Sequence, residues 1–197
     1  LHTYGIFMDE TVHTITDAKT LKKLEITDST VLTGDIIGAR GEYSSVEEVV
    51  IRGSSIRLND EYTYNYCTIG GGTNGSFGSI DIQNSQIHIP SSGGNTAIGN
   101  GWQVYYNRES RIRIANSQVS VRNLKFGPAI GSGYTSHGGR MDIIIENSTV
   151  TAKGGNLRSG TDYIPGIGKN ASGCNTVIGI QILNSTVDSF RLTEKGG

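Results

Sequence analysis

Proline, cysteine and aromatic residues are scarce in this chain: 3 of its 197 residues are proline, 2 are cysteine and 7% are aromatic. Two cysteines are too few for a disulfide framework. Cys67 comes two residues before an Ile-Gly pair, whereas Cys174 comes seven residues after a later Ile-Gly pair. Because the two thiols fall at different points of the repeat described below, we expect both to be free, with no redox role and no metal site.

Long apolar runs and a basic excess are also missing. The formal net charge is -1, so the chain lacks the positive charge that binding to a phosphate backbone requires. No segment approaches the roughly 18 consecutive apolar residues of a membrane span, and the first residues do not have the pattern of a secretion signal. We therefore expect neither a nucleic-acid partner nor membrane insertion. Because the chain starts at a leucine, we expect one domain over 1–197 from a longer polypeptide with flanking domains.

Glycine, in contrast, is abundant, and two short motifs recur. Glycine makes up 28 of 197 residues, about twice the usual share of about 7%. The first motif reads I-x-I-x-N-S-x-V and occurs, in full or degraded form, at 24–33, 49–58, 80–89, 112–121, 143–152 and 180–189. The second motif reads A-I-G-x-G and occurs, with variations, at 68–72, 97–101, 129–133 and 166–170. Two motifs that repeat together at this spacing indicate one supersecondary unit in a stacked array.

The spacing of apolar residues inside the first motif predicts strands. Ile80 and Ile82 alternate with polar residues, as do Ile87 and Ile89, and no helical spacing extends over a comparable stretch. The five residues from Ile82 to Ile87 would place these two side chains on opposite faces of a straight strand. A sharp bend at Asn84 returns both to the same side, and asparagine and glycine tolerate the left-handed backbone that such a bend needs.

Stacked bends predict both a ladder and a fold. At the roughly 4.8 Å spacing of neighbouring strands, the amides at the bend would hydrogen-bond along the axis. This predicted ladder consists of Asn84, Asn116, Asn147 and Asn184. The prediction is an all-β protein, a right-handed single-stranded parallel β-helix with about five to six coils of roughly 31 residues. Residues 1–20 form an incomplete first coil, 21–190 hold the repeats, and the A-I-G-x-G motif supplies the third sheet.

Aromatic residues supply the candidate ligand site. Trp102 and Tyr134 directly follow the A-I-G-x-G motif in two consecutive repeats, so we expect them at the same edge, with Tyr105 and Tyr106 close by. Flat rings with a polar rim stack on sugar rings, which favours a glycan ligand. Packing of these rings over the core is the alternative interpretation.

Acidic residues give no clear catalytic pair. We expect Asp81, Arg113 and Ile144 to follow one another in a single outward column, while Glu146 has Ala115 and Leu183 beside it and stands alone. Asp142 and Glu109 are expected in loops close to arginines. Glycoside hydrolysis needs two carboxyl groups roughly 5 to 9.5 Å apart, and no column stacks two acids, so an ion pair or a solvated surface is the favoured role of these residues.

The two motifs together resemble the right-handed parallel β-helix modules of large secreted or surface-anchored bacterial proteins, which are described as carbohydrate-binding or adhesin-like. The pectate lyase and polygalacturonase families share this architecture. Polygalacturonases are identified by N-T-D, paired aspartates, G-H-G and R-I-K, of which only fragments occur here, at 136–139 and 111–113. No catalytic residue is carried over from that family.

The resulting hypothesis is a non-catalytic binding or adhesion module, extracellular or at the bacterial cell surface, without a cofactor or metal. Its expected partner is a glycan or a host or cell-surface glycoprotein. Two alternatives stay open. One is a polysaccharide-degrading lyase or glycoside hydrolase, and the other is a structural stalk or adhesin repeat that binds a protein.

Overall fold

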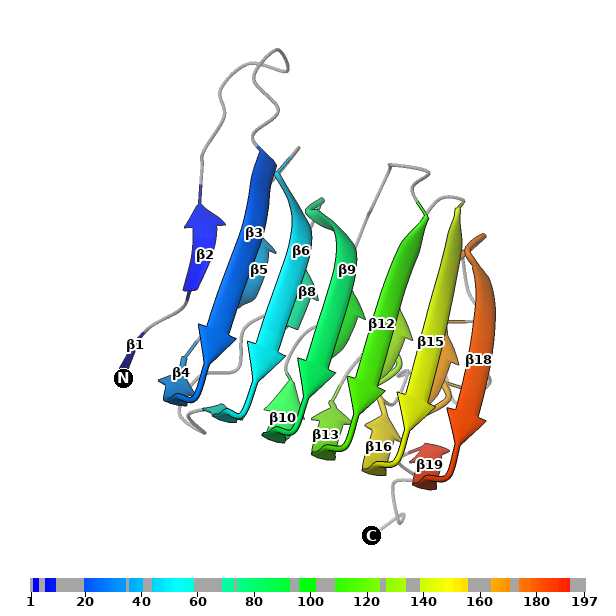
Figure 1. Ribbon diagram of the computed structural model, residues 1–197. Helices are drawn as coiled ribbons and strands as arrows, with labels where there is room; N and C mark the ends of the chain where they lie inside the picture. Colours follow the sequence, from blue (N-terminus) through cyan, green and yellow to red (C-terminus); the bar gives the residue numbers. More distant parts are fainter. Residues whose placement is uncertain are drawn as a thin grey trace, which may run out of the picture.

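The computed structural model describes residues 2–3, 6–9, 20–34, 36–40, 44–58, 69–72, 74–92, 96–101, 109–124, 127–133, 139–155, 164–170 and 174–191. Throughout these ranges the regular structure is strand, with no helix, which confirms the predicted all-β class. No helix in the described ranges has the length and hydropathy to span a membrane. The strands form three sheets in which every recorded pairing is parallel, an arrangement compatible with a parallel β-helix (Figure 1).

The front sheet of Figure 1 has six strands. In spatial order these are β3 (Thr20–Thr27), β6 (Ser45–Arg52), β9 (Ser76–Gln83), β12 (Ser110–Ala115), β15 (Arg140–Glu146) and β18 (Val177–Leu183). The order along the sheet follows the order in the sequence, so each strand pairs with its counterparts in the repeats before and after it.

A seven-stranded sheet follows the front sheet after the bend in each repeat. Its strands are β1 (His2–Thr3), β4 (Thr30–Thr33), β7 (Ser55–Leu58), β10 (Gln86–Ser92), β13 (Gln118–Asn123), β16 (Thr149–Gly154) and β19 (Thr186–Arg191). Two-residue breaks join each long strand to the next, as between Gln83 and Gln86.

The third sheet, here called the glycine sheet, is built from the A-I-G-x-G motif. Its strands are β2 (Ile6–Asp9), β5 (Ile37–Arg40), β8 (Ile69–Gly71), β11 (Ile98–Asn100), β14 (Ile130–Ser132) and β17 (Ile167–Lys169). The isoleucines at the start of the motif are buried, as predicted. Two strands, β2 and β5, have no full copy of the motif, and the sequence did not identify them.

One hydrophobic core runs between the three sheets and is filled by branched aliphatic side chains. Ile80, Ile82, Ile112 and Ile114 are fully buried, and each isoleucine pairs in register with its counterpart across β9 and β12. Burial of each such side chain stabilises the fold by about 1.5 to 3 kcal/mol. The alternation read from the sequence thus correctly identified the buried face of these strands.

The bend between the front sheet and the seven-stranded sheet has the predicted left-handed backbone. The φ angles of Asn84, Asn116, Asn147 and Asn184 lie between 47° and 49°, and Asp28 and Gly53 occupy the same position with φ of 45° and 56°. The asparagines are neighbours along the stacking direction, because the backbone N–H of Asn84 donates to the carbonyl oxygen of Ala115, the residue before Asn116. The asparagine side chains are exposed rather than enclosed, so the ladder of amides stays a prediction.

Serine hydroxyls, rather than amides, make the recorded side-chain hydrogen bonds along the axis at this bend. A serine follows the bend residue in all six repeats, and the backbone N–H of each of the first five donates to the hydroxyl of the serine in the next repeat. The five donor-to-acceptor steps, all 3.0 to 3.1 Å long, run Ser29, Ser54, Ser85, Ser117, Ser148, Ser185. Each hydroxyl in turn donates to the carbonyl oxygen two residues before it, as Ser117 does to Ala115 over 2.7 Å.

Replacing Ser117 with alanine is expected to lower the free energy of unfolding by about 1 to 3 kcal/mol, because the buried Ser85 N–H would lose its acceptor. Urea denaturation followed by circular dichroism measures this loss. Ser120→Ala, on the half-exposed outer face of β13, the strand that directly follows Ser117, is the matched control and should change stability by less than about 0.5 kcal/mol. Equal stability of the two variants would contradict the structural role of the serine column.

Candidate functional site

The outer face of the front sheet holds a chain of alternating charges. It consists, in order, of Lys23, Glu25, Arg52, Asp81, Arg113 and Glu146. The first contact is 2.9 Å long, and the contacts of Arg52 with Glu25 and Asp81 measure 3.5 and 3.8 Å. Side chains that are partly exposed to water contribute at most about 1 kcal/mol per pair, so the chain is a modest stabilising feature.

Arg113 is the centre of this chain. Its strand partners are Asp81 on one side and Ile144 on the other, as the sequence predicted. The guanidinium lies 3.2 Å from Asp81 and also forms a short ion pair with Glu146, which lies diagonally across the next strand. The predicted column neighbours of Glu146, Ala115 and Leu183, are confirmed. The prediction that Glu146 stands alone is wrong, because the long Arg113 side chain reaches beyond its own column.

The charges set the direction of two pKa shifts within this chain of ion pairs. The hydrogen bond from Lys23 is the largest cause of the lowered pKa of Glu25. Partial burial opposes the charge on Arg113, but hydrogen bonds to Glu146 and Asp81 outweigh it and raise the pKa of the guanidinium. Glu146 and Asp81 thus hold the same cation, which is the arrangement expected of structural ion pairs.

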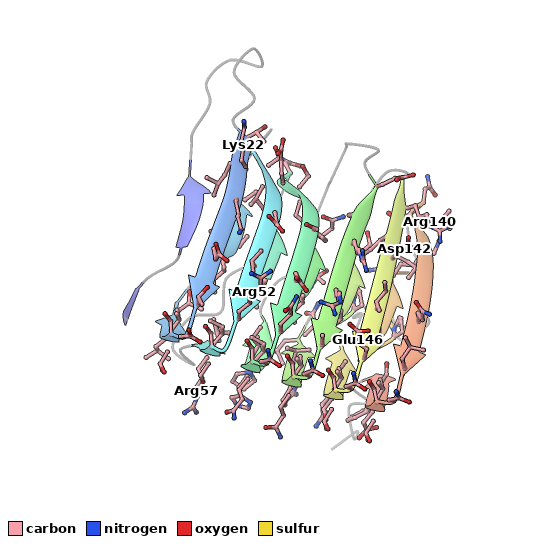
Figure 2. All side chains as sticks on the ribbon, in the orientation of Figure 1. Lys22, Arg52, Arg57, Arg140, Asp142 and Glu146 are labelled. Atoms are coloured by element: carbon pink, nitrogen blue, oxygen red, sulfur yellow. The ribbon has the colours of Figure 1, made fainter. Side chains whose placement is uncertain are left out.

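Near the start of β12, β15 and β18 the same face has an open pocket of about 440 Å³. Its lining consists of Arg111, Arg140, Asp142, Ile143, Ile144, Gly179, Ile180 and Gln181. Figure 2 shows Arg140 and Asp142 side by side at this end of β15. Asp142 lies within β15 rather than in a loop, so the loop prediction for this residue is wrong. The pocket combines cations, a carboxylate, an amide and aliphatic surface.

Arg140 and Asp142 form the closest ion pair in the pocket. Nε of Arg140 donates to Oδ1 and Oδ2 of Asp142 over 2.9 and 3.1 Å, and Nη2 lies 2.8 Å from Oδ1. The hydrogen bond to Asp142 raises the pKa of the Arg140 guanidinium. The two side chains are two residues apart on one strand, so the strand period places both on the outer face.

The four aromatic residues predicted to bind ligand, Trp102, Tyr105, Tyr106 and Tyr134, lie outside the described residues. In the sequence, the segments 102–108 and 134–138 directly precede Glu109 and Gly139, and hence β12 and β15. Both segments therefore lead into strands that line the pocket. Cys174 is buried and free, and Cys67 also lies outside the described residues.

Sequence reasoning missed the pocket, although its signal was partly visible. Arg111, Asp142 and Gly179 follow one another in a single column of three consecutive repeats. The first two have large charged side chains, and the third has none. Comparison with models of known protein families, with curated proteins and with solved structures found no match to this chain.

Proposed function

We propose that this chain is a right-handed single-stranded parallel β-helix of about five to six coils that serves as a non-catalytic binding module for glycan. Its setting in this proposal is a larger secreted or surface protein of a bacterium, with flanking domains on the same polypeptide. The observation that supports the proposal most is the open pocket of about 440 Å³ on the front sheet. Its volume lies within the range of ordinary ligand sites.

The chemistry of the pocket suits a sugar. Arg140 and Asp142 offer hydrogen-bond donors and acceptors for hydroxyl groups, and the Gln181 side chain offers both. Ile144 adds an aliphatic surface between them, which matches the C–H face of a sugar ring. The sequence places Trp102 and Tyr134 in the segments that lead into two of the lining strands, where aromatic rings would add stacking surface.

A glycan array tests this function directly. Wild-type protein is expected to bind a subset of glycans, and Trp102→Ala and Tyr134→Ala are each expected to weaken that binding about threefold to tenfold, the usual contribution of one aromatic contact. Phe190→Ala is the control, because Phe190 is a partly exposed ring of the seven-stranded sheet whose face contacts Lys153. Circular dichroism establishes that each variant is folded.

The other outcomes separate the alternatives. Retained binding in both Trp102→Ala and Tyr134→Ala would remove the aromatic residues from the site. Release of reducing ends from pectins, glycans or mucins would make the chain an enzyme. Absence of any glycan binding would contradict the proposal.

A protein-binding stalk or adhesin repeat is the second candidate, and one observation favours it. The described residues that are large, hydrophobic and exposed lie on the last two strands, as Val177, Ile180, Ile182, Leu183 and Phe190. Exposed apolar surface of this kind marks contact sites. Binding of the chain to protein ligands but not to glycans would support this candidate.

A further inference from the structure

The pocket on the front sheet has one guanidinium without an internal counter-ion. Asp142 directs both carboxylate oxygens to Arg140, as described above. Arg111 is the direct cross-strand neighbour of Asp142 and would be its expected partner. Within the described ranges, however, the Arg111 side chain makes neither a hydrogen bond nor an ion pair. Glu109, which directly precedes β12, lies near enough to favour the charge on Arg140 as Asp142 does, so both carboxylates act on Arg140. Arg111 is the cation of the pocket lining that no described side chain pairs with.

Gly179 explains why Asp142 lies away from Arg111. Gly179 is the neighbour of Asp142 on the other side, in β18. A Cβ atom at this position would lie 2.5 Å from Oδ1 of Asp142 and 3.3 Å from Nη2 of Arg140. The missing side chain thus leaves the space in which Arg140 and Asp142 pair, and this pairing keeps the carboxylate from neutralising Arg111.

We infer that Arg111 binds an anionic group of the ligand, so that the module prefers an acidic glycan, one whose sugars have carboxylate or sulfate groups. This inference rests on the proposed glycan-binding function and adds the ligand class. A guanidinium offers a planar fork of donors that matches carboxylate and sulfate oxygens. The whole chain has a net charge of -1, so a preference for anions has to come from a local site rather than from overall attraction.

The neighbouring side chains complete the recognition. Gln181 lies in the column next to that of Gly179 along β18 and can bond to hydroxyl groups beside the anionic group. Ile144 lies between Arg113 and Gln181 in the same outward column and offers apolar contact. An anionic sugar would therefore meet a cation, an amide and an aliphatic surface together, whereas a neutral sugar would leave the cation unused.

Calorimetric titration with three matched oligosaccharides tests the inference: a hexuronate oligomer, a sulfated hexose oligomer and the neutral hexose oligomer. At least one anionic oligomer is expected to bind about tenfold or more tightly than the neutral one, and the comparison of carboxylate with sulfate identifies the group. Arg111→Gln is expected to weaken anionic binding by about tenfold to a hundredfold, the range of a charged hydrogen bond, and to leave neutral binding unchanged.

Arg52→Gln is the matched control, because Arg52 lies on the same face but already pairs with Glu25 and Asp81. It should leave anionic binding within about twofold of wild type. Asp142→Asn should strengthen anionic binding by removal of the only carboxylate that lines the described pocket. Gly179→Ala should weaken it, because the added methyl group displaces the Asp142 carboxylate toward Arg111.

The failure of this inference differs from failure of the proposed function. Binding of anionic and neutral oligomers with equal affinity, or an Arg111→Gln variant that binds the anionic oligomer as wild type does, would overturn the preference for acidic glycans and leave glycan binding intact. If none of the oligomers and no glycan on the array binds, both proposals are overturned. Thermal unfolding of every variant separates loss of binding from loss of fold.

Discussion

Gly131→Ala is expected to destabilise the protein by more than about 4 kcal/mol or to prevent its folding. The φ angle of Gly131 is 135°, a backbone conformation that residues with a Cβ atom rarely adopt. A Cβ atom there would also collide with the carbonyl oxygen of Gly168 in the next strand of the glycine sheet. The side chain and the stacked backbone cannot occupy the same space, so the two strands would have to separate.

Gly53→Asn is the control for this prediction. The φ angle of Gly53 is 56°, close to that of the asparagines at the same bend position in other repeats. A Cβ atom at Gly53 would meet the carboxylate of Asp28, which is the end of a side chain and can turn aside, so asparagine is expected to change the free energy of unfolding by less than about 1 kcal/mol. Thermal and urea unfolding measure both variants. A Gly131→Ala protein as stable as wild type would show that the backbone of the glycine sheet is not closely stacked.

Ile145→Ala is expected to cost about 2 to 5 kcal/mol of stability, the usual effect of creating a cavity in a packed core. Ile145 is fully buried in β15. Its partner in the next strand, Ile182, has the same residue type and register but is 47% exposed. Ile182→Ala should therefore cost well under half as much, since the exposed fraction already contacts water.

Urea denaturation of the two isoleucine variants gives the comparison directly. Residue type, register and substitution are the same, so the difference in unfolding free energy reports the difference in burial between the inner strand β15 and the edge strand β18. Equal losses in the two variants would mean that Ile182 is covered in solution by something that the chain itself does not provide. A small loss in Ile145→Ala would contradict the position of the core.

Much of the fold could be predicted from the repeats. Apolar alternation indicated the buried face, the odd number of residues between Ile82 and Ile87 indicated the bend, and counting from bend to bend predicted the register of Asp81, Arg113 and Ile144. These features depend on backbone geometry, which the sequence period reflects directly. β5 escaped notice because its Ile37-Gly38 pair occurs without the remainder of the motif.

The bend shows where such reasoning assigned the wrong emphasis. Asparagine attracted attention because amides can form ladders, yet the bend residue varies among aspartate, glycine and asparagine. The serine after it does not vary across the six repeats, and it is the serine that makes the recorded hydrogen bonds along the axis. The positive φ angle at the bend explains why asparagine, aspartate or glycine occurs there, whereas the hydrogen bonds of the hydroxyl explain why serine follows in every repeat.

The pocket could be predicted only in part. The column of Arg111, Asp142 and Gly179 follows from register, but whether Asp142 pairs with Arg111 or with Arg140 depends on side-chain rotamers and on the space above Gly179. Long charged side chains choose among several partners within reach, as Arg113 does when it contacts Glu146 diagonally. Sequence spacing does not decide between such partners.

The hydrogen bonds of the serine column all point the same way along the axis, from each repeat to the one that follows it in the sequence. In an inner repeat the serine hydroxyl accepts a hydrogen bond from the serine N–H of the preceding repeat, and the N–H of the same serine donates to the hydroxyl in the following repeat. A whole repeat could be duplicated or deleted without changing the junction on either side, because the interfaces are interchangeable. Each such change would lengthen or shorten the axis by about 4.8 Å and leave its cross-section unaltered, so the length of the molecule can change independently of the outer face of the front sheet.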